Sequence, residues 1–183
     1  MIIIKSRPLF YTLCLLLMSC GIRFFLYSNP IPPDPEWRIS RKIVTERLPA
    51  DSEHEIFTPS QKPEYKNRII NHLLSIDESI NGRIIVLSTG ANPRQDYVFL
   101  DDSLCIVMYE WENLPQSTLD IMLGELGHRY GLPQTGEDNS LPSLSYRDTR
   151  SCVLLIKRPS GSKGTDVRLY LYPRNLFYYL LQH

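Results

Sequence analysis

Apolar side chains recur at every third or fourth position in two stretches of the chain, which is the spacing of one buried helix face. In the first stretch these positions are Tyr65, Ile69, Leu73, Ile76 and Ile80. They predict a helix from about Pro63 to Ser79, ended by Asn81 and Gly82. In the second stretch they are Leu119, Met122, Leu123, Leu126 and Tyr130. They predict a helix from about Ser117 to Tyr130, which Gly131 stops.

Five shorter runs have the composition and the turn-like borders of β-strands. They are Arg83 to Thr89, Tyr97 to Leu100, Leu104 to Glu110, Cys152 to Lys157 and Val167 to Tyr172. Between the second and third runs, Asp101-Asp102-Ser103 predicts a three-residue hairpin turn, because short polar side chains tolerate the backbone angles of such turns. The stretch Arg38 to Glu46 is predicted as an edge strand, and Asn175 to Gln182 as a short aromatic helix.

These elements follow one another as hairpins separated by helices, without the strand–helix–strand alternation of a parallel sheet. The sequence therefore predicts an α+β fold with a mainly antiparallel sheet of four to five strands, two main helices and a short C-terminal helix. Leu132 to Ser151 is rich in Ser, Pro, Asn and Gly, and it is predicted as a long loop. Loops of that length are often functional.

Prolines mark the expected domain boundary. Seven of the 14 prolines lie between Ser28 and Pro63, and a proline-rich stretch is stiff and extended. Residues 20–62 are therefore predicted as a spacer, and residues 63–183 as a single α+β domain. Residues 1–19, before the spacer, are predicted as a signal peptide for the reasons given in the next paragraph. The chain after the signal is long enough for one domain with its own core.

The first residues have the pattern of an export signal. Lys5 and Arg7 precede an apolar run from Leu9 to Met18, which is too short to span the hydrocarbon core of a membrane, since that takes roughly 20 helical residues. The run Leu16-Leu17-Met18-Ser19-Cys20 resembles the lipobox of bacterial lipoproteins. The resemblance implies that Cys20 is lipidated and becomes the first residue of the mature protein. It also implies, from Gly21, sorting to the outer membrane where the source has one.

An alternative follows from the apolar residues that come after Cys20. Ile22 to Tyr27 is apolar apart from Arg23, so Pro8 to Tyr27 is also long enough to form one uncleaved signal anchor in the inner membrane. Both interpretations place the domain in the cell envelope, on the periplasmic side of the cytoplasmic membrane.

Two cysteines remain in the exported domain, Cys105 and Cys152. An oxidising compartment and two strand-borne cysteines predict one disulfide between them. The alternative is a pair of buried free thiols that pack as small hydrophobic side chains.

Charge and motifs exclude several classes of function. The formal net charge is zero and Lys and Arg form no block, so nucleic acid is not an expected partner. Glu125 and His128 are three residues apart on a helix, but both are predicted to face solvent and no third ligand is placed near them. The stretch Gly161 to Gly164 is predicted as a hairpin loop, since a phosphate-binding loop would need a helix after it. No catalytic residue, metal or cofactor is predicted.

The expected function is therefore that of an envelope lipoprotein that binds a protein partner without being an enzyme. It would act as an immunity protein or inhibitor of a delivered toxin, or as an assembly factor. The alternative is an envelope hydrolase acting on a cell-wall or lipid substrate, which a pocket containing His128 and a second titratable group would favour.

Two regions are predicted to bind the partner, the long loop and the aromatic face of the last strand. Their candidate residues are Glu137, Asp138, Tyr146, Arg147 and Arg150 in the loop, and Tyr170 and Tyr172 on the strand. The alternative for the strand is that a helix covers its two tyrosines.

Overall fold

The computed structural model describes residues 31, 33–50, 52–90, 92–138, 141–160 and 164–176. The chain divides into two compact units, 1–32 and 33–183, and all the elements named below belong to the second. The predicted signal and Cys20 lie outside the described residues, and so does the predicted C-terminal helix beyond Leu176.

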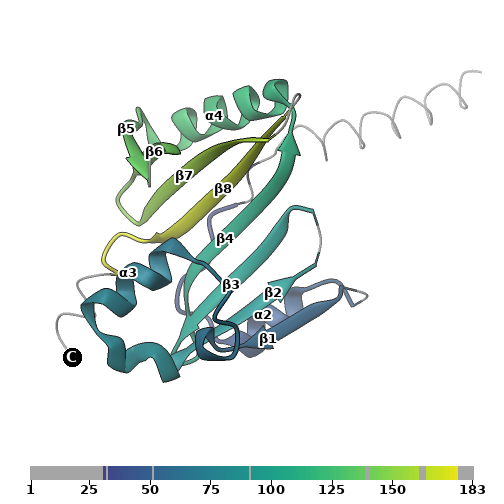
Figure 1. Ribbon diagram of the computed structural model, residues 1–183, viewed down its shortest axis with the longest axis vertical. Helices are drawn as coiled ribbons and strands as arrows, with labels where there is room; N and C mark the ends of the chain where they lie inside the picture. The colour runs from purple at the N-terminus through teal and green to yellow at the C-terminus, as the bar shows by residue number, and fades with distance from the viewer. Residues whose placement is uncertain are drawn as a thin grey trace, which may run out of the picture. The chain divides into compact units, whose positions relative to one another are not determined.

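The described part of the chain forms one antiparallel sheet of eight strands, in the order β1-β2-β3-β4-β8-β7-β6-β5 (Figure 1). The strands are β1 His54–Phe57, β2 Ile84–Thr89, β3 Arg94–Leu100, β4 Ser103–Leu114, β5 Gln134–Asp138, β6 Leu141–Arg147, β7 Ser151–Ser160 and β8 Gly164–Pro173. The predicted fold of four to five strands with two main helices is therefore wrong, because the sheet dominates the structure. The five predicted strands are present, and β1, β5 and β6 join them.

Three α-helices occur among the described residues, α2 Arg41–Arg47, α3 Arg68–Ile76 and α4 Gln116–Tyr130, with short 3-10 helices η1 Pro59–Gln61 and η2 Glu78–Arg83. The predicted second helix is confirmed as α4. The first begins later than predicted, because Asn67 caps it: its Oδ1 accepts hydrogen bonds from the backbone N–H groups of Ile69 and Ile70, at 3.0 and 3.1 Å. The strand predicted over Arg38 to Glu46 is wrong, since α2 occupies most of that stretch.

The segment between Leu132 and Ser151 is a β-hairpin rather than a loop. β5 pairs with β6, and β6 pairs with β7, so the segment extends the sheet beyond β7. Backbone hydrogen bonds to neighbouring strands fix these residues although their own strand propensity is low. Likewise, α2, β1 and η1 lie within the range predicted as a proline-rich spacer.

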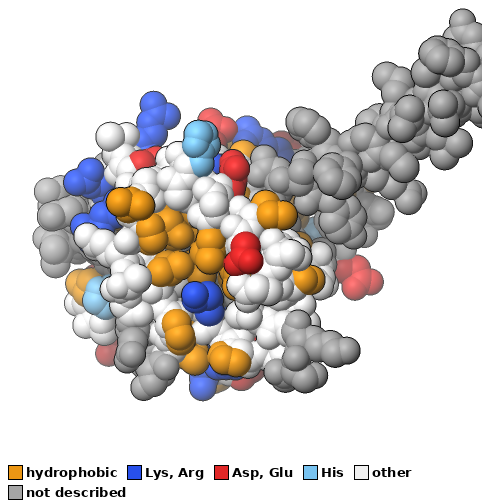
Figure 2. All heavy atoms as spheres, turned by 90° about the horizontal axis from the view of Figure 1, so that it is seen from above, with side chains coloured by type: hydrophobic (Ala, Val, Ile, Leu, Met, Phe, Trp, Pro, Cys, Tyr) orange, Lys and Arg blue, Asp and Glu red, His pale blue; other side chains and the backbone are white. Residues whose placement is uncertain are grey.

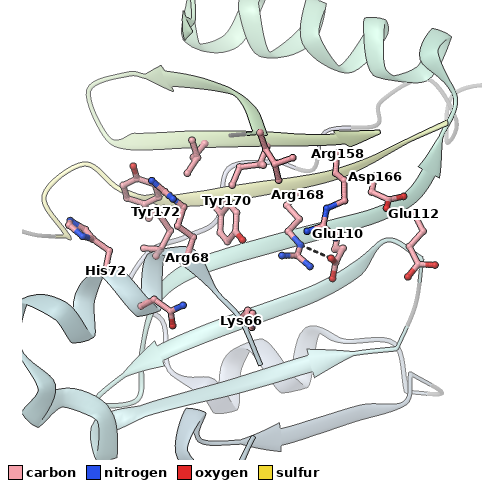
Figure 3. A pocket seen from close by; sticks show the side chains of 15 residues that line it. Lys66, Arg68, His72, Glu110, Glu112, Arg158, Asp166, Arg168, Tyr170 and Tyr172 are labelled. Carbon is pink, nitrogen blue, oxygen red and sulfur yellow. Dashed lines mark hydrogen bonds and ion pairs between the residues drawn. The ribbon is translucent and has the colours of Figure 1, made fainter. Parts of the chain in front are cut away.

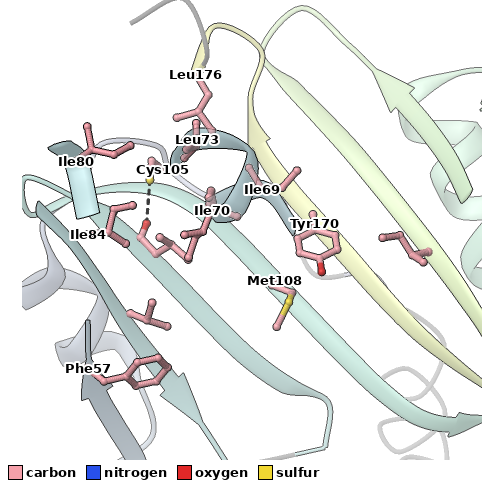
Figure 4. Packing of buried hydrophobic residues seen from close by; sticks show 14 residues of the cluster. Phe57, Ile69, Ile70, Leu73, Ile80, Ile84, Cys105, Met108, Tyr170 and Leu176 are labelled. Carbon is pink, nitrogen blue, oxygen red and sulfur yellow. Dashed lines mark hydrogen bonds between the residues drawn. The ribbon is translucent and has the colours of Figure 1, made fainter. Parts of the chain in front are cut away.

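One hydrophobic core lies between α3 and one face of the sheet. Ile69, Ile70 and Leu73 of α3 are buried there, against side chains that include Met108 of β4 and Tyr170 of β8 (Figure 4). Helix α2 lies on the other side of the sheet (Figure 1). Coverage on both faces explains why β4 reads as an apolar run from Leu104 to Tyr109 rather than as a strict alternation.

The turn between β3 and β4 is one residue shorter than predicted. Leu100 pairs with Ser103, which leaves Asp101 and Asp102 as the two turn residues. Their φ angles are 50° and 60°, and two-residue turns of type I′ require a positive φ at both positions. Aspartate adopts this conformation more readily than most residues other than glycine.

The predicted disulfide is absent: within the described residues, Cys105 and Cys152 are both free thiols. They lie on β4 and β7, and β8 runs between these strands. Two strand spacings amount to about 10 Å, whereas a disulfide joins Cα atoms no more than roughly 7 Å apart. Cys105 is buried, and burial raises the pKa of its thiol to about 12. Both thiols are therefore unbridged, as the alternative expected, but only Cys105 is buried, since Cys152 is half-buried.

Candidate functional site

A row of charged side chains crosses the middle of the sheet, on the face that α3 partly covers. Arg94 of β3 pairs in register with Glu110 of β4, which pairs in register with Arg168 of β8. Side chains of directly opposed residues in neighbouring strands lie on the same face. The Nε of Arg168 donates a hydrogen bond of 2.6 Å to Oε1 of Glu110, and Nη1 of Arg94 lies 3.5 Å from Oε2. We call Arg94, Glu110 and Arg168 the charged row.

A buried carboxylate anchors one end of the charged row. Asp96 is 0% exposed, and it accepts hydrogen bonds from Nε and Nη2 of Arg94 at 3.1 and 2.9 Å. It also accepts hydrogen bonds from the hydroxyls of Tyr65, at 2.8 Å, and Ser88, at 2.6 Å. These donors compensate the cost of burying a charge.

The same contacts fix the protonation of the neighbouring groups. The hydrogen bond to Asp96 raises the pKa of Arg94, so this guanidinium stays charged. Burial, reinforced by the charge of Asp96, raises the pKa of Tyr65, so its hydroxyl stays protonated and remains a donor. Asn67, the cap of α3, donates from Nδ2 to the Tyr65 hydroxyl at 3.3 Å. The start of α3 is thereby linked to the charged row.

Two hollows on this face meet over the charged row. The wide hollow, of about 1110 Å³, lies between α3 and strands β4, β7 and β8 (Figure 3). The second hollow, of about 760 Å³, extends toward β1 and β2. Both are lined by Lys66, Glu110, Arg158 and Arg168, so together they form one continuous groove. Figure 3 shows Arg158 and Arg168 beside Glu110 in the wide hollow.

The structure does not bring together into a site those predicted loop residues whose side chains it describes, which are Tyr146, Arg147 and Arg150. Tyr146 is 2% exposed within β6, so it is a core residue and not an exposed contact. Arg147 and Arg150 are exposed at the β6–β7 turn and do not line the described groove. Glu137 and Asp138 belong to β5, of which the structure describes the backbone but not these two side chains.

The two tyrosines of the last strand have different surroundings. Tyr170 is 1% exposed, so its prediction as an open binding residue is wrong. The alternative of a covering helix holds for it, since α3 packs over it; the predicted C-terminal helix lies outside the described residues beyond Leu176. The Tyr170 hydroxyl accepts hydrogen bonds from the backbone of Arg68 and from the side chain of Arg168. Tyr172 is half-buried and lines the wide hollow.

Glu125 and His128 do not form an acid–base or metal site with described residues. His128 is exposed on α4, and Glu125 lies 3.5 Å from Arg129 instead. Neither residue lines the described groove. Among the residues that the structure describes, no three His, Cys, Asp or Glu side chains come together in a way that could hold a metal ion.

A second face of the molecule carries exposed hydrophobic side chains. Figure 2 views the molecule from above Figure 1, where α4 lies uppermost, and shows hydrophobic side chains gathered near the centre among scattered charged ones. Two large exposed hydrophobic residues belong to α4 and the turn after it: Ile121 is 54% exposed and Leu132 is 95% exposed. Neither lines the groove.

Of the helices in the described part of the chain, none has the length and hydropathy to cross a membrane.

Sequence reasoning missed the charged row, because its members are far apart in the chain and only strand register brings them together. One signal was present: Glu110 ends the apolar run of β4, and Arg168 interrupts the apolar residues of β8. A charged residue within a strand of a large sheet indicates a partner of opposite charge on the neighbouring strand.

Comparisons of the chain with family models, with curated proteins and with solved structures return no match.

Proposed function

We propose that this chain is a membrane-tethered, non-enzymatic protein-binding module of the cell envelope, and that its groove receives a segment of the partner. The groove is the observation that supports the proposal. Its wide hollow has about 1110 Å³, and four residues continue the lining into a second hollow. Pockets for small molecules usually have about 300–1,000 Å³ and a predominantly apolar lining. This groove is larger and more charged, as expected for a surface that binds a stretch of polypeptide.

The charged row supports binding rather than chemistry. Hydrogen bonds within the sheet and to Asp96 hold its side chains in place before any partner arrives. Preorganised charges lower the entropic cost of association and select a partner of complementary charge. An immunity protein, an inhibitor of a delivered toxin and an assembly factor would each need such a surface.

Site-specific photo-cross-linking in cells tests the proposal. A benzophenone amino acid placed at Asn71, in the wide hollow, or at Glu64, in the second, lies on an exposed groove position. We expect both positions to form an adduct with the same envelope protein, identified by mass spectrometry. That protein, once purified, should bind the wild-type chain.

The matched control places the same amino acid at Ile121, which is exposed but does not line the groove. This position should not form the adduct. Adducts from Ile121 alone, or none from either groove position, would show that the groove is not the binding surface.

Membrane tethering is proposed to occur through a lipid on Cys20. The lipobox-like run Leu16 to Cys20 supports it. Metabolic labelling with a clickable fatty acid should label the wild-type chain, and Cys20→Ser should lose both the label and membrane retention. An unprocessed Cys20→Ser chain that stays in the membrane would establish the signal anchor instead.

A further inference from the structure

The centre of the groove has an excess of positive charge. We call the residues that line both hollows, Lys66, Glu110, Arg158 and Arg168, the junction. The one carboxylate of the junction, Glu110, is already engaged by Arg168 and Arg94, and Arg94 also binds the buried Asp96 beside the junction. Lys66 and Arg158 are exposed and form no ion pair with any residue that the structure describes. Two basic side chains at the junction are therefore available to a ligand.

The carboxylate opposite Arg158 is held elsewhere. Arg158 pairs in register with Asp166, but Oδ1 of Asp166 accepts a hydrogen bond of 3.0 Å from the backbone N–H of Asn113. That contact, the largest cause, lowers the pKa of Asp166. The backbones of Gly164 and Asn113 are closely packed here: a Cβ added to Gly164 would lie only 2.8 Å from the carbonyl carbon of Asn113. Asp166 thus reduces the net positive charge near Arg158 but does not form an ion pair with it.

Exposed acidic side chains lie beside the junction in both hollows. Glu53 and Glu64 line only the second hollow, and Glu112 lines only the wide hollow. All three are exposed, and none is in an ion pair within the described structure. The second hollow therefore adds unpaired acidic groups beside the basic junction, whereas the wide hollow outside the junction contains both the acidic Glu112 and the basic Arg68.

We propose that the junction binds carboxylate groups of acidic side chains on the protein partner, and that basic side chains next to them in the partner face Glu53 and Glu64 of the second hollow. This inference rests on the proposed function, since it names the chemistry of the segment that the groove receives. A guanidinium group can bind a carboxylate through two parallel hydrogen bonds, and an ammonium group adds a mobile point charge. Arg158 and Lys66 supply one of each. Like charges would repel a partner of the reverse pattern both at the junction and in the second hollow.

Binding of short labelled peptides tests this charge pattern. The full-length chain in a mild non-ionic detergent is titrated against two fluorescein-labelled peptides, followed by fluorescence anisotropy. One has a central pair of glutamates flanked by lysines, and the other has central lysines flanked by glutamates. We expect the first to bind at least about tenfold more tightly.

Charge reversal then identifies the residues responsible. Lys66→Glu and Arg158→Glu should each weaken binding of the first peptide by about tenfold. The control is Lys42→Glu on α2, an exposed lysine that does not line the groove, and it should leave affinity unchanged. Unchanged melting temperatures would show that the variants fold. Equal affinity of wild type and both groove variants, or tighter binding of the second peptide, would overturn the inference.

The two proposals fail separately. If Asn71 and Glu64 cross-link one protein in cells but neither charge reversal alters peptide binding, the junction does not select acidic side chains and the groove still binds protein. If no adduct forms at either groove position, the proposed function fails and the inference falls with it.

Discussion

Truncation of Tyr170 to alanine will lower the free energy of unfolding by about 3–5 kcal/mol, as expected for a buried aromatic ring. Tyr170 is 1% exposed and belongs to the cluster between α3 and the sheet. Removal of the ring would leave a cavity under the first turn of α3. It would also remove the acceptor that the Tyr170 hydroxyl offers to Arg68 and Arg168. Urea unfolding followed by the fluorescence of Trp37 and Trp111 measures the change.

Tyr170→Phe separates the ring from its hydroxyl. This variant keeps the packing and loses only the hydrogen bonds, so it should cost about 1 kcal/mol. A small loss of stability in both variants would mean that α3 does not pack over this part of β8. The same result would restore the interpretation of Tyr170 as an exposed contact residue.

The central strands could be predicted from the sequence because their burial shows in their composition. β2, β4, β7 and β8 contain apolar runs that only a sheet covered on both faces would bury. Helix α4 could also be predicted, since Leu119, Met122 and Leu126 repeat at helical spacing and are buried. In these elements the local pattern and the tertiary packing agree.

The outer strands carry no such signal. β5 has no apolar residue, and β6 contains Pro142, Ser143 and Ser145 among its seven residues. Their strand structure comes from pairing with β7, which is a tertiary effect that propensity does not express. The edge strand β1 has four residues, of which only Phe57 is buried. Its sequence therefore shows no alternation of buried and exposed positions from which a strand could be predicted. The sequence therefore predicted a loop and a spacer where the structure has strands.

The groove could not be predicted for a different reason. Arg94, Glu110 and Arg168 are ordinary surface residue types, and no spacing in the sequence links them. Their proximity depends on the registers of β3 with β4 and of β4 with β8. A one-residue slip in either register would move a member of the row to the other face. Register is set by the whole hydrophobic pattern, so it becomes known only with the fold.

Replacement of Asp96 by asparagine will cost about 2–3 kcal/mol of stability, since it removes a buried charge that several donors were arranged to meet. Arg94 would lose the carboxylate that holds it at 2.9 and 3.1 Å. The hydroxyls of Tyr65 and Ser88 would compete for one remaining carbonyl oxygen. Because Arg94 is 40% exposed and still reaches Glu110, the loss should stay below that of a fully buried ion pair. Urea unfolding of Asp96→Asn measures it.

The matched control is Asp101→Asn, which also removes a carboxylate bound by an arginine. Arg83 donates to both oxygens of Asp101, but both residues are exposed. Solvent screens an exposed ion pair, so this variant should cost less than about 1 kcal/mol. A double-mutant cycle with Arg94→Gln should then find that Asp96→Asn costs less once Arg94 is absent, because the two side chains are coupled. If Asp96→Asn costs no more than Asp101→Asn, or the cycle shows no coupling, Asp96 does not anchor the charged row and the groove's central charges are not preorganised.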